Sequence, residues 1–369
     1  MRIGIPKEIK VHEYRVGLTP SGVKELCNQK HTVFVETHAG EKIGFSDQDY
    51  QDAGAILCQS SDQVWQQGQL IIKVKEPLAE EVEQIRQDHI LFTYLHLAAS
   101  ETLTHDLLKS GCTAIAYETI TDQFQRLPLL APMSEVAGRM SVQAGAHCLE
   151  IAQKGRGVLL GGVPGVPPGK VSILGGGVVG TNAAIMALGL GADTTIYDNS
   201  PDRLRVLDAQ FNGRLKTVYS TQDSIYQAIC QSDLIIGAVL IPGAAAPKLV
   251  TREHLSHMPQ GAVIVDVAID QGGCFESSRV TTHAEPTYTK QGIVHYCVGN
   301  MPGAVARTST LALTNATMPY VIKLANNDWR SILHDEPFFA KGLNLSNGHI
   351  YCPGVADAFD LPLRPINQI

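Results

Sequence analysis

Three glycines in the middle of the chain have the spacing of a site that binds the phosphates of a dinucleotide. Gly175, Gly177 and Gly180 stand in the order G-x-G-x-x-G, after an apolar β-type run and before a helical segment of small residues. The first glycine would permit a tight turn, the second would let the backbone approach a pyrophosphate, and the third would let the helix pack on its strand. The N–H groups at the helix N-terminus would then face the phosphates. A glycine-rich turn in some other α/β fold is the alternative.

Asp198 supports the dinucleotide interpretation and indicates which dinucleotide is bound. It ends the second β-type run, 21 residues after Gly177, where a carboxylate can accept both ribose hydroxyls of an adenosine. The same carboxylate would repel the 2′-phosphate of NADP, so we predict NAD as the cofactor. Arg203 lies nearby in the sequence and could receive such a phosphate, which leaves NADP open as the alternative.

Reactive side chains also stand where predicted strands end. Lys75 and His96 end two strands of the first domain, and Asp270 follows the apolar run of residues 262–268. Ligands bind beyond the carboxyl ends of the strands in open parallel sheets, so these three are candidate functional residues. Each also has a structural explanation, since Lys73 and Lys75 share a strand face and could both be solvated. His96 could equally be a hydrogen-bonded core histidine, and Asp270 could cap a turn.

The elements that would hold these residues alternate between strand and helix, which predicts an α/β fold with parallel pairing. Residues 1–128 are expected to form one α/β domain. A long helix rich in small residues is expected over residues 134–154, with Ser134 as its N-cap. The last helix, from Pro302 to about Asn326, and the tail are expected to return to the first domain. Strands are expected at 2–5, 32–36, 70–75, 89–96 and 113–117 in the first domain, and six more form a doubly wound sheet at 171–174, 194–197, 216–219, 233–239, 262–268 and 293–298.

The length and charge of the chain limit the classes of partner that it can have. Its 369 residues suggest two domains. With a net charge of −7 and no long run of like charge, neither nucleic acid nor an anionic membrane is expected as the main partner. The eight cysteines are scattered without a C-x-x-C pair, which indicates reduced thiols in a cytoplasmic protein. We find no signal-peptide core, no apolar run that could span a membrane and no H-E-x-x-H motif, so no metal is expected.

Eight stretches of the chain form a combined set of motifs. They are residues 4–8 (GIPKE), 15–20 (RVGLTP), 74–77 (VKEP), 91–98 (LFTYLHLA), 132–139 (PMSEVAGR), 174–180 (LGGGVVG), 265–273 (VDVAIDQGG) and 299–305 (GNMPGAV). On this set the chain resembles the bacterial L-alanine dehydrogenase family over essentially its whole length. Saccharopine dehydrogenases and the soluble part of proton-translocating transhydrogenase share the fold and fragments of the same motifs, but they fit the length and the combined set less well.

The resemblance implies a specific architecture and activity. It implies two Rossmann-like doubly wound parallel-sheet domains, with an NAD-binding domain (129–304) inserted in a split catalytic domain (1–128 plus 305–369). The expected assembly is a homo-hexamer. The expected reaction is the reversible, NAD-dependent oxidative deamination of L-alanine to pyruvate and ammonium, by hydride transfer from the alanine Cα to NAD.

The resemblance also assigns roles to single residues. Arg15 resembles the residue that grips the substrate carboxylate, a role that suits a planar guanidinium, and Lys75 resembles the contact to the keto or amino end. His96 and Asp270 resemble the catalytic pair, with His96 exchanging protons and Asp270 orienting water. The tail after Asn326 matches least well. The residues expected to bind NAD are Ser134, Gly175, Gly177, Val178, Val179, Gly180, Asp198, Arg203, Ser220, Val239, Leu240, Val267, Ala268, Ile269, Arg279, Val298, Gly299, Asn300 and Met301.

Two other classes of function stay open at this point. One is a different dehydrogenase, either of the saccharopine type, which would need lysine and 2-oxoglutarate, or a transhydrogenase subunit, which would need a membrane partner. The other is a non-enzymatic module that binds NAD, which would not need the set Arg15, Lys75, His96 and Asp270.

Overall fold

The computed structural model describes residues 1–239 and 246–368, and its contacts divide the chain into two units. Unit 1 consists of Met1–Met133 and Val305–Ile369, and unit 2 consists of Ser134–Ala304. The predicted division was placed after residue 128 and before residue 305. Within the described ranges, no helix is long and apolar enough to cross a membrane.

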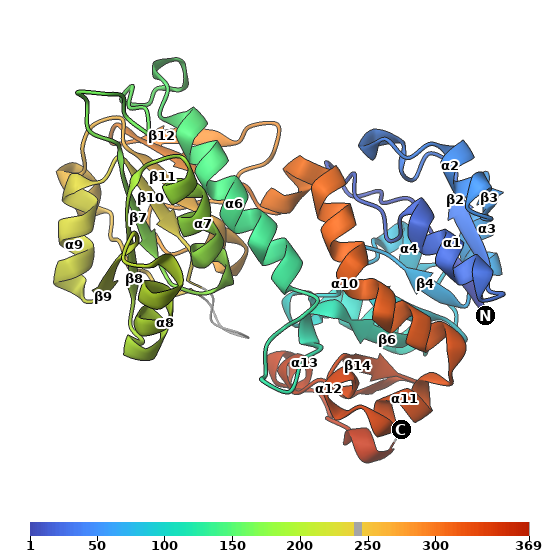
Figure 1. Ribbon diagram of the computed structural model, residues 1–369. Coiled ribbons are helices and arrows are strands. Elements are labelled where there is room, and N and C mark those ends of the chain that lie inside the picture. Colours follow the sequence, from blue (N-terminus) through green and yellow to red (C-terminus); the bar gives the residue numbers. More distant parts are fainter. Residues whose placement is uncertain (240–245, 369) are drawn as a thin grey trace. The chain divides into compact units, whose positions relative to one another are not determined.

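Unit 1 is built on an eight-stranded sheet in the order β15-β14-β6-β5-β4-β1-β2-β3 (Figure 1). Strands β1 to β6 pair in parallel, whereas β14 pairs antiparallel with β6 and β15 antiparallel with β14. The tail therefore returns to the first sheet, as we expected. The strands are β1 (Arg2–Ile5), β2 (Thr32–Glu36), β3 (Ile56–Cys58), β4 (Leu70–Ile72), β5 (Ile90–Thr93), β6 (Thr113–Ala116), β14 (Leu343–Ser346) and β15 (His349–Ile350).

The helices of unit 1 begin where their sequences provide N-caps. The Thr19 side chain accepts the N–H of Gly22, with Pro20 at the first helical position, and Ser46 and Asp49 form a capping box. The helices are α1 (Pro20–Asn28), α2 (Asp47–Asp52), α3 (Ser61–Gln67), α4 (Ala79–Val82), α5 (Glu101–Ser110), α10 (Ala306–Asn326), α11 (Trp329–Asp335), α12 (Pro337–Ala340) and α13 (Pro353–Phe359).

Unit 2 contains a seven-stranded sheet in the order β12-β13-β11-β10-β7-β8-β9, in which all neighbours except β12 and β13 pair in parallel. The prediction of six strands was wrong, because β12 is a polar edge strand without an apolar run. It joins β13 through Gln291 and Gly292, whose positive φ angles of 51° and 79° suit a tight hairpin. The strands are β7 (Lys170–Leu174), β8 (Asp193–Asp198), β9 (Lys216–Tyr219), β10 (Leu234–Gly237), β11 (Val263–Asp266), β12 (Thr287–Lys290) and β13 (Ile293–Tyr296).

Helices cover both faces of this sheet, with α6 and α7 on one side and α9 on the other (Figure 1). Helix α6 starts at Ala131 and ends at Cys148, so the expected N-cap at Ser134 was wrong and the helix is shorter than predicted. Pro132 occupies its first turn, where a missing N–H costs no hydrogen bond. The other helices are α7 (Val178–Gly189), α8 (Pro201–Phe211) and α9 (Gln222–Gln231).

Small residues let α6 approach its neighbours, as the composition of this helix predicted. A Cβ atom at Gly138 would stand 2.2 Å from the carbonyl oxygen of Val179 in α7, and one at Gly145 would stand 2.6 Å from the side chain of Leu234 in β10. The central strands of unit 2 are apolar and buried on both faces, which is typical of parallel sheets covered by helices. The chain therefore has the predicted α/β fold with two Rossmann-like sheets.

Candidate active site

Three of the four predicted substrate and catalytic residues follow neighbouring strands of unit 1. Arg15 lies in the segment after β1, Lys75 lies three residues after β4, and His96 lies three residues after β5. The strands β1, β4 and β5 are adjacent and parallel, so all three residues lie beyond the same edge of the sheet. Asp270 belongs to unit 2 and is described with that unit.

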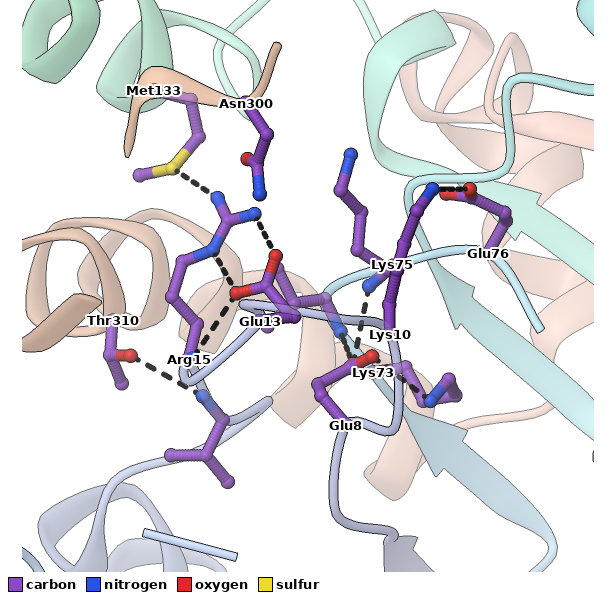
Figure 2. A network of polar contacts seen from close by, with 12 residues as sticks. Glu8, Lys10, Glu13, Arg15, Lys73, Lys75, Glu76, Met133, Asn300 and Thr310 are labelled. Atoms are coloured by element: carbon purple, nitrogen blue, oxygen red, sulfur yellow. Dashed lines mark hydrogen bonds and ion pairs between the residues drawn. The ribbon is translucent and has the colours of Figure 1, made fainter. Parts of the chain in front are cut away.

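Arg15 is held by a carboxylate that the sequence did not identify. Glu13 accepts Nε of Arg15 at 2.7 Å and Nη2 at 2.5 Å, and its Oε1 also accepts the main-chain N–H of Arg15 (Figure 2). The Nη1 atom lies 3.1 Å from the sulfur of Met133. Both side chains of the Arg15–Glu13 pair are buried. Burial alone would lower the pKa of Arg15, but the Glu13 carboxylate outweighs this and raises that pKa, so the guanidinium stays charged.

Lys75 is presented by a short segment whose backbone is fixed by side chains. Its main-chain N–H donates to Glu8 Oε1 at 3.2 Å, and its carbonyl oxygen accepts the hydroxyl of Thr93 at 2.9 Å. The side chain of Lys75 is partly exposed. The predicted strand 70–75 ends earlier, at Ile72, so Lys75 stands in an irregular segment beyond the ladder.

The alternative in which Lys73 is solvated together with Lys75 does not hold. The side chain of Lys73 is 1% exposed, and its ammonium donates to Glu8 at 3.1 Å and to Glu81 at 2.6 Å. Burial alone would lower the pKa of Lys73, but the two carboxylates outweigh this and raise it. Glu8 is also buried, which raises the pKa of its carboxyl group against the opposing effect of Lys73. A lysine with two buried carboxylate partners has a structural rather than a solvated role.

His96 stands in a left-handed backbone conformation, with φ 50° and ψ 37°. Such a conformation is uncommon for a residue other than glycine, and it persists where neighbours hold it. Glu118, which follows β6, holds this turn, because its Oε1 accepts the N–H of His96 at 2.6 Å and that of Leu95 at 3.1 Å. The same oxygen lies 3.9 Å from Nδ1 of His96, whose side chain is 47% exposed. The histidine is therefore an accessible residue and not the core histidine of the alternative interpretation.

Tyr94 supports the imidazole of His96 from one side. The two rings stack with centroids 5.9 Å apart and an interplanar angle of 6°. The Tyr94 hydroxyl donates to the carbonyl oxygen of Leu129 at 2.6 Å, and burial raises the pKa of this tyrosine. The tyrosine therefore stays neutral and gives His96 a fixed aromatic surface on one face.

The glycine loop of unit 2 has the geometry that its spacing predicts. Gly175 has a φ of 102°, which only glycine adopts readily, and a Cβ atom at Gly177 would meet no heavy atom within 4 Å. At Gly180, in contrast, a Cβ would stand 1.9 Å from the carbonyl oxygen of Gly175. Helix α7 begins directly after Gly177, with Val178 exposed. The loop thus combines a tight turn, an open approach to a helix N-terminus and close packing of helix on strand.

Asp198 and Arg203 both contact this loop. Asp198 ends β8, and its carboxylate accepts the N–H of Gly176 at 2.7 Å and that of Ser200 at 2.8 Å. Arg203 donates through Nε to the carbonyl oxygen of Gly176 and through Nη2 to Thr181, at 2.6 Å each. The carboxylate therefore stands beside the glycine loop, where a ribose would be expected, while the guanidinium is bonded into the loop.

The other predicted cofactor residues follow the carboxyl ends of parallel strands of unit 2. Ser220 follows β9, Val239 follows β10, and residues 298–301 follow β13. Val267, Ala268 and Ile269 lie in a 3-10 helix after β11. Arg279 is exposed and stacks on the ring of Tyr288, 4.2 Å from its centroid. Ser134 lies inside α6, and Leu240 lies outside the described residues.

Asp270 lies in the same 3-10 helix and is exposed. Its Oδ2 accepts the main-chain N–H of Asn300 at 3.5 Å, so the segments after β11 and β13 meet at this carboxylate. Asp266, at the end of β11, fixes the base of the turn, because it accepts the hydroxyl of Ser278 at 2.6 Å and the N–H of Cys274 at 3.0 Å. Burial raises the pKa of Asp266. An exposed carboxylate on a turn held by a buried one can act on a ligand.

Two sequence profiles cover most of the chain. Residues 4–137 match the profile described as "Alanine dehydrogenase/PNT, N-terminal domain", and residues 141–353 match "Alanine dehydrogenase/PNT, C-terminal domain". The chain belongs to the alanine dehydrogenase/PNT family. Within this family, the alanine dehydrogenase of Halomonas elongata is 62% identical over 98% of this chain and 97% of the relative. That of Mycolicibacterium smegmatis is 52% identical over 100% of this chain and 99% of the relative.

Solved structures agree with membership of the alanine dehydrogenase/PNT family. A structure of L-alanine dehydrogenase superposes with a TM-score of 0.95 at 53% identity, over 98% of this chain and 99% of that one. The transhydrogenase of Sinorhizobium meliloti superposes with a TM-score of 0.82 at 24% identity, over 96% of this chain and 99% of that one. The second likeness shows the fold alone. The resemblance inferred from the sequence motifs is thus confirmed.

The residues that sequence reasoning missed are the carboxylates beneath the predicted site of this family member. Glu8, Glu13, Glu118 and Asp266 each accept main-chain N–H groups near a predicted functional residue. Glu8, Glu118 and Asp266 stand at a strand end or within three residues of one, and that position was the available signal. Glu13 stands two residues from Arg15, which it binds. The partners of Glu8 and Glu118 lie on other strands or loops, so the role of these two becomes visible only in the folded chain.

Proposed function

We propose that this chain catalyses the reversible, NAD-dependent oxidative deamination of L-alanine to pyruvate and ammonium. The observation that carries the proposal is the 62% identity to a curated alanine dehydrogenase over 98% of the chain. The three residues at one edge of the unit 1 sheet support it, because a guanidinium, an ammonium and an imidazole suit a substrate that carries a carboxylate and a carbonyl.

NAD is the cofactor that the residues of unit 2 fit. The backbone at Gly177 is open to a close approach, the start of α7 follows it, and Asp198 stands where it would accept ribose hydroxyls. The carboxylate disfavours a 2′-phosphate, and Arg203 is bonded to Gly176 and Thr181. The other predicted contacts would complete the site. When bound, NAD would accept the hydride from the substrate Cα.

The residues of unit 1 would bind the substrate and move its protons. In our proposal Arg15 receives the carboxylate, and Glu13 fixes the angle at which the guanidinium is presented. Lys75 contacts the amino or keto end, and in the aminating direction its ammonium polarises the carbonyl oxygen. His96 acts as general acid and base, because an imidazole can both give and take a proton near neutral pH.

Asp270 would direct the water that completes the reaction. After oxidation the substrate is an imine, and water oriented by Asp270 adds to its carbon. His96 then transfers a proton to the nitrogen of the resulting carbinolamine. This nitrogen leaves as ammonia, and the remaining product is pyruvate. In this scheme the imine carbon gains the oxygen of one water and loses one nitrogen, so the atoms balance.

Two further features belong to the proposal. We propose a cytoplasmic location, which the eight free thiols fit because reduced cysteines are the rule in that compartment. We also propose a homo-hexamer, on the family resemblance, and light scattering of the purified protein would measure its mass. Small-molecule substrates, and not nucleic acid or membrane, are the partners that we expect.

The test is the absorbance of NADH with purified protein, pyruvate and ammonium. We expect consumption that requires both pyruvate and ammonium and that is much slower with NADPH. Consumption with 2-oxoglutarate and lysine instead would replace the proposal with a saccharopine-type dehydrogenase. Binding of NADH without any turnover would favour a non-enzymatic module. In an active enzyme, His96→Ala should remove nearly all turnover while it leaves NADH affinity within a few fold.

A further inference from the structure

We propose that Glu8 is a positioning residue that sets the place of Lys75. The inference rests on the proposed function, in which Lys75 contacts the keto or amino end of the substrate. Glu8 lies three residues after β1 and is 7% exposed. Its Oε1 accepts the N–H of Val74 at 2.6 Å and the N–H of Lys75 at 3.2 Å (Figure 2). One carboxylate oxygen thus binds the two consecutive amides that carry Lys75.

The backbone of Lys75 needs such a partner because the strand has already ended. Strand β4 stops at Ile72, and beyond it the main-chain groups of Lys75 are bonded to side chains. Glu8 accepts its N–H, and the Thr93 hydroxyl donates to its carbonyl oxygen at 2.9 Å. These two side chains come from the segments after β1 and at the end of β5, the strands on either side of β4.

Lys73 holds the Glu8 carboxylate in its orientation. Its ammonium lies 3.1 Å from Glu8 Oε2 and 2.6 Å from Glu81 Oε1. The other oxygen of Glu81 accepts the N–H of Leu78 at 2.9 Å, at the start of α4. The segment that carries Lys75 is therefore bound to the same buried ion cluster at two places. Glu8 binds the amides of Val74 and Lys75, and Glu81 binds the amide of Leu78.

Charge makes this arrangement stiffer than neutral hydrogen bonds would. Hydrogen bonds to a carboxylate are shorter and stronger than those to an amide, and the second oxygen of Glu8 is paired with the Lys73 ammonium. A glutamine at position 8 would keep an acceptor oxygen but lose the attraction of Lys73. Such a change should loosen residues 74 and 75 and leave Lys73 paired with Glu81.

The test is a double-mutant cycle between Glu8 and Lys75. In the wild-type background, Glu8→Gln should lower kcat/KM for pyruvate by at least about tenfold, while KM for NADH changes less than about twofold. In the Lys75→Met background, Glu8→Gln should lower kcat/KM by less than about twofold further, because the group that it positions is already gone. Equal losses in both backgrounds, or no loss in either, would overturn the inference.

Asp233→Asn is the matched control. Asp233 is also a buried carboxylate that accepts a main-chain N–H, from Lys170 at 2.8 Å, and pairs with a cation, Arg156 at 2.9 Å. It lies in unit 2 and takes no part in the proposed chemistry. We expect this variant to lose stability with kcat/KM for pyruvate unchanged within about twofold. A loss of kcat/KM as large as that of Glu8→Gln would show a general effect of buried carboxylates and overturn the inference.

Hydrogen exchange separates this inference from the proposed function. If the wild-type protein does not turn over pyruvate, the proposed function fails, and exchange then tests the contact alone. In Glu8→Gln the amides of Val74 and Lys75 should exchange at least about tenfold faster, with exchange in β4 unchanged, and unchanged exchange at both amides would refute the contact. If Glu8→Gln does not fold, Glu8→Asp keeps the charge on a shorter side chain and should show the same coupling to Lys75.

Discussion

Oε1 of Glu118 lies 2.6 Å from the main-chain nitrogen of His96 and 3.9 Å from Nδ1 of its imidazole. The carboxylate thus stabilises the left-handed turn at His96 and places a negative charge beside the ring. Tyr94 stacks on the same ring. The position of His96, the proposed general acid and base, is therefore fixed by groups that follow β5 and β6, while its side chain stays accessible.

Glu118→Gln should weaken this turn. The amide keeps one acceptor oxygen but loses charge-assisted bonds to two N–H groups, so we expect a loss of about 1–3 kcal/mol in unfolding free energy. Turnover should fall about tenfold as the imidazole becomes less ordered, with NADH affinity unchanged. Steady-state kinetics and a fluorescence titration with NADH would measure both. Glu101→Gln is the control, because Glu101 lies 3.9 Å from His105 on an exposed helix surface; an equal loss of turnover there would contradict the assignment.

Glu13→Gln should strongly destabilise unit 1. It leaves the buried guanidinium of Arg15 without its carboxylate partner, and breaking such a pair costs about 3–5 kcal/mol. Urea unfolding would measure this cost. Replacing both charges, in Glu13→Gln with Arg15→Met, should cost less stability than Glu13→Gln alone, and it should abolish turnover of pyruvate. A double variant less stable than the single one would show that the charge of Arg15 is not the source of the effect.

The second and third glycines of the motif, Gly177 and Gly180, should separate cofactor binding from folding. Gly177→Ala meets no atom within 4 Å, so its stability should change by less than about 0.5 kcal/mol while NADH affinity falls at least about tenfold. Gly180→Ala collides with the carbonyl of Gly175 and should lose more than about 2 kcal/mol. Gly189→Ala, in an open position of the same helix, should gain about 0.5–1 kcal/mol. If Gly177→Ala bound NADH as tightly as the wild type, a cofactor phosphate would not contact the backbone at Gly177.

Asp198→Ala should weaken NAD binding by at least about tenfold and reduce the discrimination against NADP, because it removes the carboxylate that would meet the ribose. Affinities for both nucleotides would be measured by titration. The variant also frees the N–H groups of Gly176 and Ser200, so its thermal stability must be compared with that of a control. Asp193→Ala removes a carboxylate from the other end of β8, where it pairs with Lys216. If the ratio of the affinities for NAD and NADP is unchanged in Asp198→Ala, Asp198 does not contact the ribose.

His89 should make the stability of unit 1 depend on pH. It is fully buried, its Nδ1 accepts the N–H of Arg86, and burial lowers its pKa from 6.5 to about 4. The unfolded chain binds a proton to this residue first as pH falls, so the stability present above pH 6.5 is lost between about pH 6.5 and 4. The loss amounts to about 3 kcal/mol. Urea unfolding of the wild type and of His89→Gln across this range would test it, since the variant should lack this part of the slope.

Much of the fold could be predicted from local patterns in the sequence. Apolar runs located the expected strands to within a few residues, because a buried parallel strand must be apolar along its whole length, but β3 and β14 of unit 1 were not expected. The roles of the three motif glycines could be predicted, because a tight turn, an approach of the backbone to a ligand and close packing of helix on strand each leave no room for a side chain. Strand β12 was missed because an edge strand needs no apolar run, and its pairing depends on β13. The N-cap of α6 was misplaced because Pro132 starts a helix as readily as Ser134.

The residues of the candidate site were predicted, but the carboxylates that hold them in place were not. Lys75 and His96 could be found at strand exits, since topology alone brings such exits to one edge, whereas Arg15 was assigned only through the family resemblance. The burial of Lys73 could not be predicted, because it depends on Glu8 and Glu81, which reach it from other segments. Glu118 binds a main-chain amide 22 residues earlier, and a hydrogen bond between side chain and backbone leaves no periodic pattern in the sequence.

The antiparallel pairing of β14 with β6 has a consequence for how the chain is made. Thr113 and Ser346 share a hydrogen bond across 233 residues, so β6 has an open edge until the ribosome has added the whole of unit 2 and helix α10. Unit 2 is continuous and can complete its sheet earlier. An uncovered apolar strand edge invites pairing with other chains. During synthesis the sheet of unit 1 therefore keeps an open strand edge for longer than the sheet of unit 2 does.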